Sequence, residues 1–180
     1  MITVRGKQVD VLFSAEAISD EVGRLAREIA AVAGEDLVVV SVLKGAFVFA
    51  ADLIRAMHHV GVAPQVEFIS LSSYGAGTVG GEVKILRDID ADVAGRPVLL
   101  VDDILESGRT LAFARELLLS RGATKVDLAV LLDKKGHRKA DIEAAFVGFD
   151  CPDYFVVGYG MDVGHALREL PFIGHVIDQA

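Results

Sequence analysis

A chain of 180 residues, 52% of them apolar and 24% charged, can form one domain with a buried core but is too short for two full-sized domains. Its 18 basic and 26 acidic residues give a net charge of −8, which argues against a nucleic-acid binder that needs a basic face. The single cysteine, Cys151, excludes an intrachain disulfide and a zinc cage of cysteines. The N-terminus has no apolar leader, and no apolar run reaches the roughly 18 residues of a membrane span. We therefore expect a cytoplasmic protein with no membrane partner.

Apolar runs of strand length alternate with helical patterns, with no repeat or linker between them. Ser14 is placed to cap the first helix, whose apolar residues recur on one face. Helices are expected at about 14–33, 46–59 and 108–121, and strands at 37–43, 66–72, 83–86, 98–101, 126–132, 146–148 and 155–157. This order predicts an α/β fold with a mostly parallel sheet flanked by helices. Ligands of such sheets bind at the C-terminal strand ends, where the informative residues should therefore lie.

The segment 98–110 carries the strongest chemical signal in the chain. An apolar strand at 98–101 is followed directly by two neighbouring carboxylates, Asp102 and Asp103. The strand is apolar throughout, as expected of one that is buried on both faces of a parallel sheet. A pair of carboxylates at its end suits the hydroxyl groups of a ribose, bound directly or through Mg²⁺.

The turn that follows these carboxylates has the residues of an anion site. It opens a helix, so its free N–H groups and the helix dipole both favour a negative ligand. Ser107 and Thr110 add hydroxyl donors, and Gly108 lets the backbone approach a phosphate closely. The alternative is an acidic turn that only caps the helix. A Walker loop is excluded, since the chain contains no G-x-x-x-x-G-K-[ST] pattern.

Segment 98–110 resembles the signature with which type I phosphoribosyltransferases bind phosphoribosyl pyrophosphate (PRPP), and the resemblance extends along almost the whole chain. It implies the fold of that family, in which a small hood lies over the C-terminal strand ends. Residues 1–180 would then form one domain, with the hood built from both chain ends. By resemblance, the residues that contact PRPP and its phosphates are Lys44, Gly45, Asp102, Asp103, Ser107, Gly108, Arg109, Thr110 and Arg168.

Two further motifs resemble the hypoxanthine-guanine branch of this family. Leu43–Ala46 is similar to its pyrophosphate-binding loop, which implies a cis peptide bond between Lys44 and Gly45. The alternative for this segment is a strand-end turn with an exposed lysine. Ser73 and Tyr74 resemble the start of a mobile lid, which closes over the site and excludes water. A plain hairpin loop is the alternative there.

Matches to the purine side of the branch follow two later strands. Lys134 matches the lysine that donates to the purine 6-oxo group, while Phe155 and Val156 match the residues that stack on the base and read its edge. Asp162 matches a residue that meets a second Mg²⁺. From the pattern alone, Phe155 would be a core residue. A solvated face is expected to carry Lys135, His137, Arg138 and Lys139.

Glu106 is the expected catalytic residue. It stands where the branch commonly has an aspartate, the base near purine N7, and it keeps the carboxylate but adds one methylene. A second departure follows Asp162, where Val163-Gly164 replaces a frequent aromatic at the edge of the base pocket. No histidine is expected to be catalytic, neither the pair that ends a helix nor the three without metal-ligand spacing: His58, His59, His137, His165 and His175.

The resemblance implies a purine salvage enzyme. It would transfer the 5-phosphoribosyl group of PRPP to N9 of hypoxanthine, and of guanine, giving IMP or GMP and pyrophosphate. Mg²⁺ is the implied cofactor, with Asp102, Asp103 and Asp162 as its ligands. The partners would be PRPP and a 6-oxopurine, with no nucleic acid, in a homodimer or homotetramer. The alternatives are another base such as xanthine, a regulatory RNA-binding member of the superfamily, and a nucleotide-binding protein without catalysis.

Overall fold

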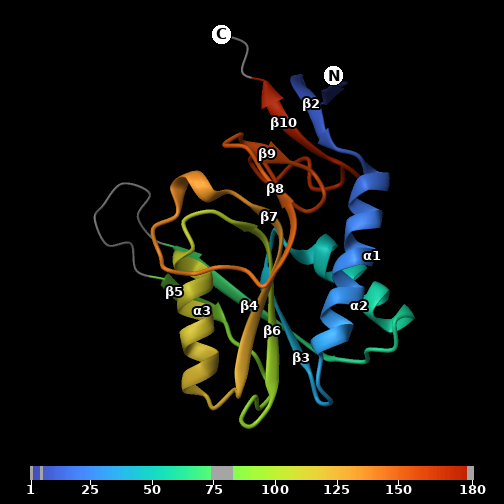
Figure 1. Cartoon of the computed structure of the whole chain (residues 1–180). Coiled ribbons are helices and arrows are strands. Elements are labelled where there is room, and N and C mark those ends of the chain that lie inside the picture. Colours follow the sequence, from blue (N-terminus) through green and yellow to red (C-terminus); the bar gives the residue numbers. More distant parts are fainter. Residues whose placement is uncertain (1, 5, 74–82, 178–180) are drawn as a thin grey trace.

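The main sheet of the protein is mixed and mostly parallel (Figure 1). The computed structural model describes residues 2–4, 6–73 and 83–177. In spatial order, the described strands of this sheet are β5 (Val83–Arg87), β4 (Gln65–Ser73), β3 (Val38–Leu43), β6 (Pro97–Leu105), β7 (Lys125–Asp133) and β8 (Phe146–Asp150). All neighbouring pairs are parallel except β4 and β5, which are antiparallel. The predicted fold class is confirmed.

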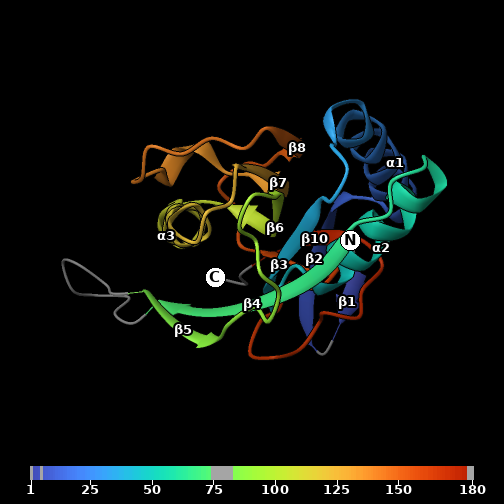
Figure 2. The same cartoon turned by 90° about the horizontal axis from the view of Figure 1, so that it is seen from below.

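Helices cover both faces of this sheet. Helices α1 (Ala15–Val32) and α2 (Phe47–His59) lie on one face, and α3 (Arg109–Ser120) lies on the other (Figure 2). Successive side chains of a strand point to opposite faces, so each central strand contributes to both cores. In β6, for example, Leu99 packs with α1 and α2, whereas Leu100 packs with α3.

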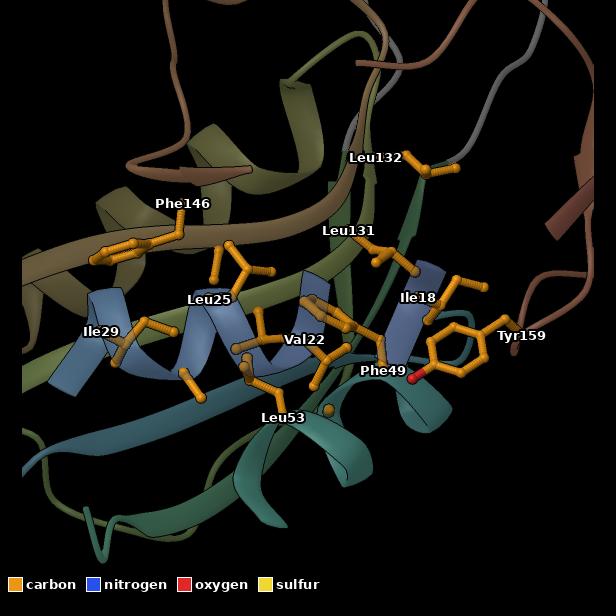
Figure 3. Packing of buried hydrophobic residues seen from close by; sticks show 14 of the residues in the cluster. Ile18, Val22, Leu25, Ile29, Phe49, Leu53, Leu131, Leu132, Phe146 and Tyr159 are labelled. Carbon is orange, nitrogen blue, oxygen red and sulfur yellow. The ribbon is translucent and has the colours of Figure 1, made fainter. Parts of the chain in front are cut away.

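Helix α1 forms because its sequence supplies both a cap and an apolar face. The Ser14 side chain accepts a hydrogen bond from the Ala17 N–H at 3.2 Å, as expected of an N-cap. Figure 3 shows the apolar row of the helix turned toward side chains of α2 and of strands β7 and β8. The row consists of Ile18, Val22, Leu25 and Ile29, each at most 4% exposed. Burying four such side chains contributes about 1.5–3 kcal/mol each.

A second, antiparallel sheet joins the two ends of the chain. Its strand order is β1 (Ile2–Val4), β2 (Lys7–Phe13), β10 (Ile173–Ile177) and β9 (Val156–Val157). Figure 1 places this sheet at one end of the main sheet, beside both chain termini. Its own small core contains Val9, Val157 and Leu167. It holds the segment that follows Phe155 against the end of the main sheet.

The boundaries of the predicted elements agree with the structure to within a few residues except at β6, whereas strands β1, β2 and β10 of the second sheet were not predicted. Strand β6 was expected to end at Val101, but its parallel pairing with β7 continues through Leu105 opposite Asp133. Asp102 and Asp103 therefore lie within the strand and not after it. The strand continues because it pairs with β7, which is distant in the sequence, and a local run of apolar residues does not predict such pairing. No helix in the described ranges has the length and apolarity needed to cross a membrane.

Candidate active site

Two adjoining pockets lie where the central parallel strands end. The larger has a volume of about 580 Å³, and the smaller, of about 190 Å³, lies against the turn between β6 and α3. Glu106 lines both pockets and so marks the place where they meet. Of the residues singled out from the sequence, the larger pocket collects Lys44, Gly45, Asp103, Glu106, Lys134, Phe155, Val156, Asp162 and Arg168. The smaller collects Asp102, Glu106, Ser107, Gly108 and Thr110.

The paired carboxylates of β6 face different pockets, because neighbouring residues of a strand point to opposite sides. Asp102 lines the smaller pocket and Asp103 the larger one. Burial raises the pKa of the Asp102 carboxyl well above its usual range, and the nearby charge of Asp103 raises it further. Burial also raises the pKa of Asp103, against the opposing effect of its hydrogen bonds and of Arg168. Each carboxylate accepts a backbone N–H of the following residue at 2.9 Å.

Replacing Asp102 by asparagine should stabilise the ligand-free protein at pH 7. A carboxyl whose pKa is raised by folding contributes stability below its unfolded pKa of about 3.9, and that stability is lost as the pH rises through the folded pKa. Asparagine removes this loss and keeps an oxygen to accept the Asp103 N–H. We expect a melting temperature a few degrees higher at pH 7, since 1 kcal/mol shifts it by about 2–4 °C in a chain of this size.

The measurement is thermal unfolding of both proteins at several pH values without ligand. The gain should shrink toward pH 4, where the wild-type carboxyl is protonated. Asp90→Asn is the matched control, because the Asp90 side chain is 88% exposed, and its melting temperature should stay close to the wild-type value. A lower melting temperature of Asp102→Asn at pH 7 would contradict the prediction.

The loop after β3 packs directly on the carboxylate of Asp103. Gly45 has no room for a side chain, because a Cβ atom there would collide with the Asp103 carboxylate. On its other side, Gly160 has φ +100° and lies against the Gly45 carbonyl. The cis peptide bond was predicted at Lys44–Gly45, and this is wrong: it is the Leu43–Lys44 bond that is cis. The motif contains two candidate bonds without a proline, so residue preference alone does not distinguish them.

The backbone of the turn between β6 and α3 lies along the smaller pocket. Gly108 is the N-cap of α3 and has φ +78°, a conformation that favours glycine. A Cβ atom at this position would also press on Ile142 and Arg138. Ser107 and Thr110 line the pocket, whereas Arg109, predicted with them, is exposed and lines neither pocket.

The purine-side residues gather at the end of β7. Lys134 is 6% exposed, and its Nζ donates to the Tyr154 carbonyl at 2.7 Å and lies 3.9 Å from Glu106 Oε1. Phe155 lines the same pocket with 60% of its surface exposed, so its interpretation as a core residue is wrong. Its carbonyl accepts the Val176 N–H at 3.2 Å, which fixes this segment to β10.

An ion pair between Asp162 and Arg168 forms part of the wall of the larger pocket. Arg168 lies 2.6 Å from an Asp162 oxygen and donates to the Gly160 carbonyl at 2.6 Å. The other Asp162 oxygen accepts the His165 N–H at 2.7 Å. Both side chains are about three-quarters buried, so their orientation is set before a ligand arrives. Of the two predicted lid residues, Ser73 ends β4, and Tyr74 lies outside the described residues.

Sequence reasoning missed two features of this region. Arg138 was expected on a solvated face, but its side chain is 19% exposed and pairs with Asp133, which is buried at the end of β7. His137, for which no metal-ligand spacing was found, lies 2.6 Å from Asp153, and ligand atoms of both lie within 4.8 Å of Glu106. The closeness of His137 to Glu106 comes from the fold, since 31 positions separate them in the sequence.

Comparisons with known proteins agree with this geometry. The family model of the phosphoribosyl transferase domain matches residues 8–163. The hypoxanthine-guanine phosphoribosyltransferase of Bacillus subtilis (strain 168) is 45% identical over 166 residues, which covers 91% of each chain. That of Aquifex aeolicus (strain VF5) is 45% identical over 181 residues, covering 99% of this chain and 100% of the relative. A crystal structure of the Bacillus anthracis enzyme has 44% identity and a TM-score of 0.88, covering 94% of this chain and 100% of that one. The chain therefore belongs to the phosphoribosyltransferase family, in its hypoxanthine-guanine branch.

Proposed function

We propose that this protein transfers the 5-phosphoribosyl group of PRPP to N9 of hypoxanthine, and of guanine, giving IMP or GMP and pyrophosphate. The observation that carries the proposal is the convergence of three kinds of group in one cavity. Lys44 and Arg168 supply positive charge, Asp103 supplies a half-buried carboxylate, and Lys134 lines the same cavity as the exposed ring of Phe155. These groups suit a pyrophosphate, a ribose and a 6-oxopurine, in that order.

In the proposed reaction the protein mainly positions the two substrates and neutralises the charge that develops on them. The bond from C1 of the ribose to the pyrophosphate oxygen breaks, and a bond from C1 to purine N9 forms. Lys44 and Arg168 neutralise the departing pyrophosphate. Glu106 takes the proton from purine N7, and the N–H groups of the turn at Ser107 and Gly108 hold the 5-phosphate. The segment beginning at Ser73 and Tyr74 acts as the lid that shields the reacting sugar from water.

Mg²⁺ is the cofactor that we propose, and the donor chemistry fits it. The larger pocket offers carboxylate oxygens at Asp103 and Asp162, and the smaller pocket offers those of Asp102. Mg²⁺ typically uses one or two carboxylates together with substrate phosphates, so an all-protein cage is not required. When bound, the ion would neutralise charge on the pyrophosphate. Without it, the carboxylates that line the pocket would repel the leaving group.

Activity should therefore need Mg²⁺. With PRPP and hypoxanthine, an excess of EDTA should abolish IMP formation, and added Mg²⁺ should restore it. The same assay with hypoxanthine, guanine and xanthine in turn tests the function as a whole and ranks the bases. Full activity in excess chelator would overturn the metal proposal, and no turnover of any 6-oxopurine would overturn the proposed function.

The remaining proposals concern the setting of the enzyme. Residues 1–180 act as one domain, in which the second sheet forms a hood from both chain ends. The lone Cys151 is buried, and burial raises its pKa, so it is a poor nucleophile and suits a reducing cytoplasm. The protein works as a homodimer or homotetramer, with small-molecule substrates and no nucleic acid, in line with its charge of −8.

A further inference from the structure

The segment that follows β7 supports the phosphate-binding turn from behind. Three successive carbonyls, that of Leu105 at the end of β6 and those of Glu106 and Ser107 in the turn, accept hydrogen bonds from residues 134–140. The Leu105 carbonyl accepts the Lys134 N–H at 2.9 Å, and the Ser107 carbonyl accepts the N–H groups of residues 139 and 140 at 2.9 and 3.0 Å. The Glu106 carbonyl accepts Nε of Arg138 at 3.0 Å.

These contacts determine where the N–H groups of the turn point. In a trans peptide unit, the carbonyl of one residue and the N–H of the next point in opposite directions. The peptides of this turn are trans. Holding the carbonyls of Leu105, Glu106 and Ser107 on one side therefore turns the N–H groups of Glu106, Ser107 and Gly108 to the other side. That side is the smaller pocket, which these residues line.

Arg138 is the side chain at the centre of this support. Its guanidinium uses four donor interactions: to the carbonyls of Glu106, Ile142 and Leu105, and to the carboxylate of Asp133. The planar guanidinium presents five N–H donors in a rigid fork, so it can hold several acceptors in one fixed arrangement. Its methylene stem lies directly under Gly108. Asp133 precedes Lys134 in the chain, so Arg138 contacts both the phosphate turn and the base-binding end of β7.

We propose that Arg138 is a positioning residue for the 5-phosphate site: it holds the carbonyls of the turn back so that the N–H groups face the phosphate. The proposal rests on the proposed function, because that function places a phosphate in the smaller pocket. Arg138 itself does not touch the substrate. It lines neither pocket, and its effect on binding passes through the backbone at Leu105 and Glu106.

The test compares binding of the nucleotide IMP with that of the nucleoside inosine, which lacks the phosphate. Isothermal titration calorimetry on the full chain gives both dissociation constants. Arg138→Met keeps the stem but removes the guanidinium, and we expect it to weaken IMP binding by about 10- to 100-fold, since hydrogen bonds to a charged group are misaligned. Inosine binding should change less than threefold. A residue that acts only on stability would lower the melting temperature and leave the ratio of the two constants unchanged.

Two further variants control for charge and for folding. Lys139→Met removes the same charge from an exposed side chain one position along, and its IMP-to-inosine ratio should equal that of the wild type. Arg138→Lys keeps the positive charge but loses the planar guanidinium with its several donors. Its ratio of inosine to IMP dissociation constants should therefore lie between those of Arg138→Met and the wild type. If Arg138→Met does not fold, the comparison of Arg138→Lys with the wild type decides. A folded Arg138 variant with the wild-type ratio overturns the proposal.

The outcome also separates this inference from the proposed function. If the wild-type enzyme forms IMP from PRPP while Arg138→Met keeps the wild-type ratio, the function stands and only the role of Arg138 is wrong. If the wild type shows no turnover and binds IMP no better than inosine, the function itself fails, and with it the phosphate site on which this inference depends.

Discussion

Replacing Glu106 by glutamine should lower kcat by about 10²–10⁴ while PRPP binding stays close to normal, because general-base catalysis contributes factors of this size. Glutamine keeps the size and hydrogen-bonding ability of the side chain but cannot take the N7 proton. Glu106 lines both pockets, and its carboxylate lies 3.9 Å from the ammonium of Lys134, so it lies where the two pockets meet. The measurement is steady-state kinetics with hypoxanthine, together with PRPP titration of the variant.

A structural role for Glu106 makes a different prediction. Glu106 precedes α3 by three positions, and a carboxylate beside a helix N-terminus contributes about 0.3–1 kcal/mol to stability through the dipole. In that case Glu106→Gln would shift the melting temperature slightly and leave kcat close to the wild-type value. Such a result would show that Glu106 is not the base and that a water molecule or another group takes the proton.

Glu106→Asp tests whether the length of the side chain matters, because it keeps the carboxylate and removes one methylene. It restores the residue common in the branch, so we expect substantial activity, with any loss reporting the missing methylene. His137→Gln is a control for the surroundings, because His137 lies within 4.8 Å of Glu106 and pairs with Asp153 at 2.6 Å. Its kcat should stay within a few fold of the wild-type value, since the group that takes the proton is still present.

The fold could be predicted because its signals are periodic and local. The strand at 38–43 is buried through Val42, as its almost entirely apolar sequence predicts, and α1 shows the helical spacing of Ile18 and Val22. The C-terminal ends of parallel strands meet at one edge, so residues after those strands could be expected to lie together. Lys44 after β3 and Lys134 after β7 do line one pocket.

What escaped prediction depends on contacts between distant residues. The extension of β6 past Val101 depends on pairing with β7, which no local pattern encodes. Arg138 was expected in solvent because it stands in a polar run, yet its buried partner Asp133 and the carbonyl of Glu106 draw it inward. Phe155 shows the opposite difference. It stands in an apolar run, which predicts burial, but its side chain is exposed in the wall of the larger pocket. Functional sites are where local rules are expected to fail.

Base choice should be strict: adenine should be used at least about 10⁴-fold less efficiently than hypoxanthine, because a site built on a hydrogen bond to a substrate group rejects an analogue that leaves its donor unpaired. In the proposed site this donor is Lys134, whose ammonium only donates. A 6-oxo group accepts from it, whereas the 6-amino group of adenine presents its own hydrogens. Lys134 is 6% exposed, so water does not readily replace the missing partner.

Lys134→Gln tests this explanation directly. A glutamine amide both donates and accepts, so the variant should narrow the ratio of kcat/KM for hypoxanthine to that for adenine by at least about tenfold, mainly through a loss with hypoxanthine. Lys135→Gln is the matched control, because Lys135 is exposed and pairs with Asp150 at 2.7 Å, away from the pocket, and it should keep the wild-type ratio.

Efficient use of adenine by the wild-type enzyme would contradict the assignment of Lys134 to the 6-position. An unchanged ratio in a folded Lys134→Gln variant would instead assign the discrimination to other polar groups of the pocket, such as the backbone of Val156.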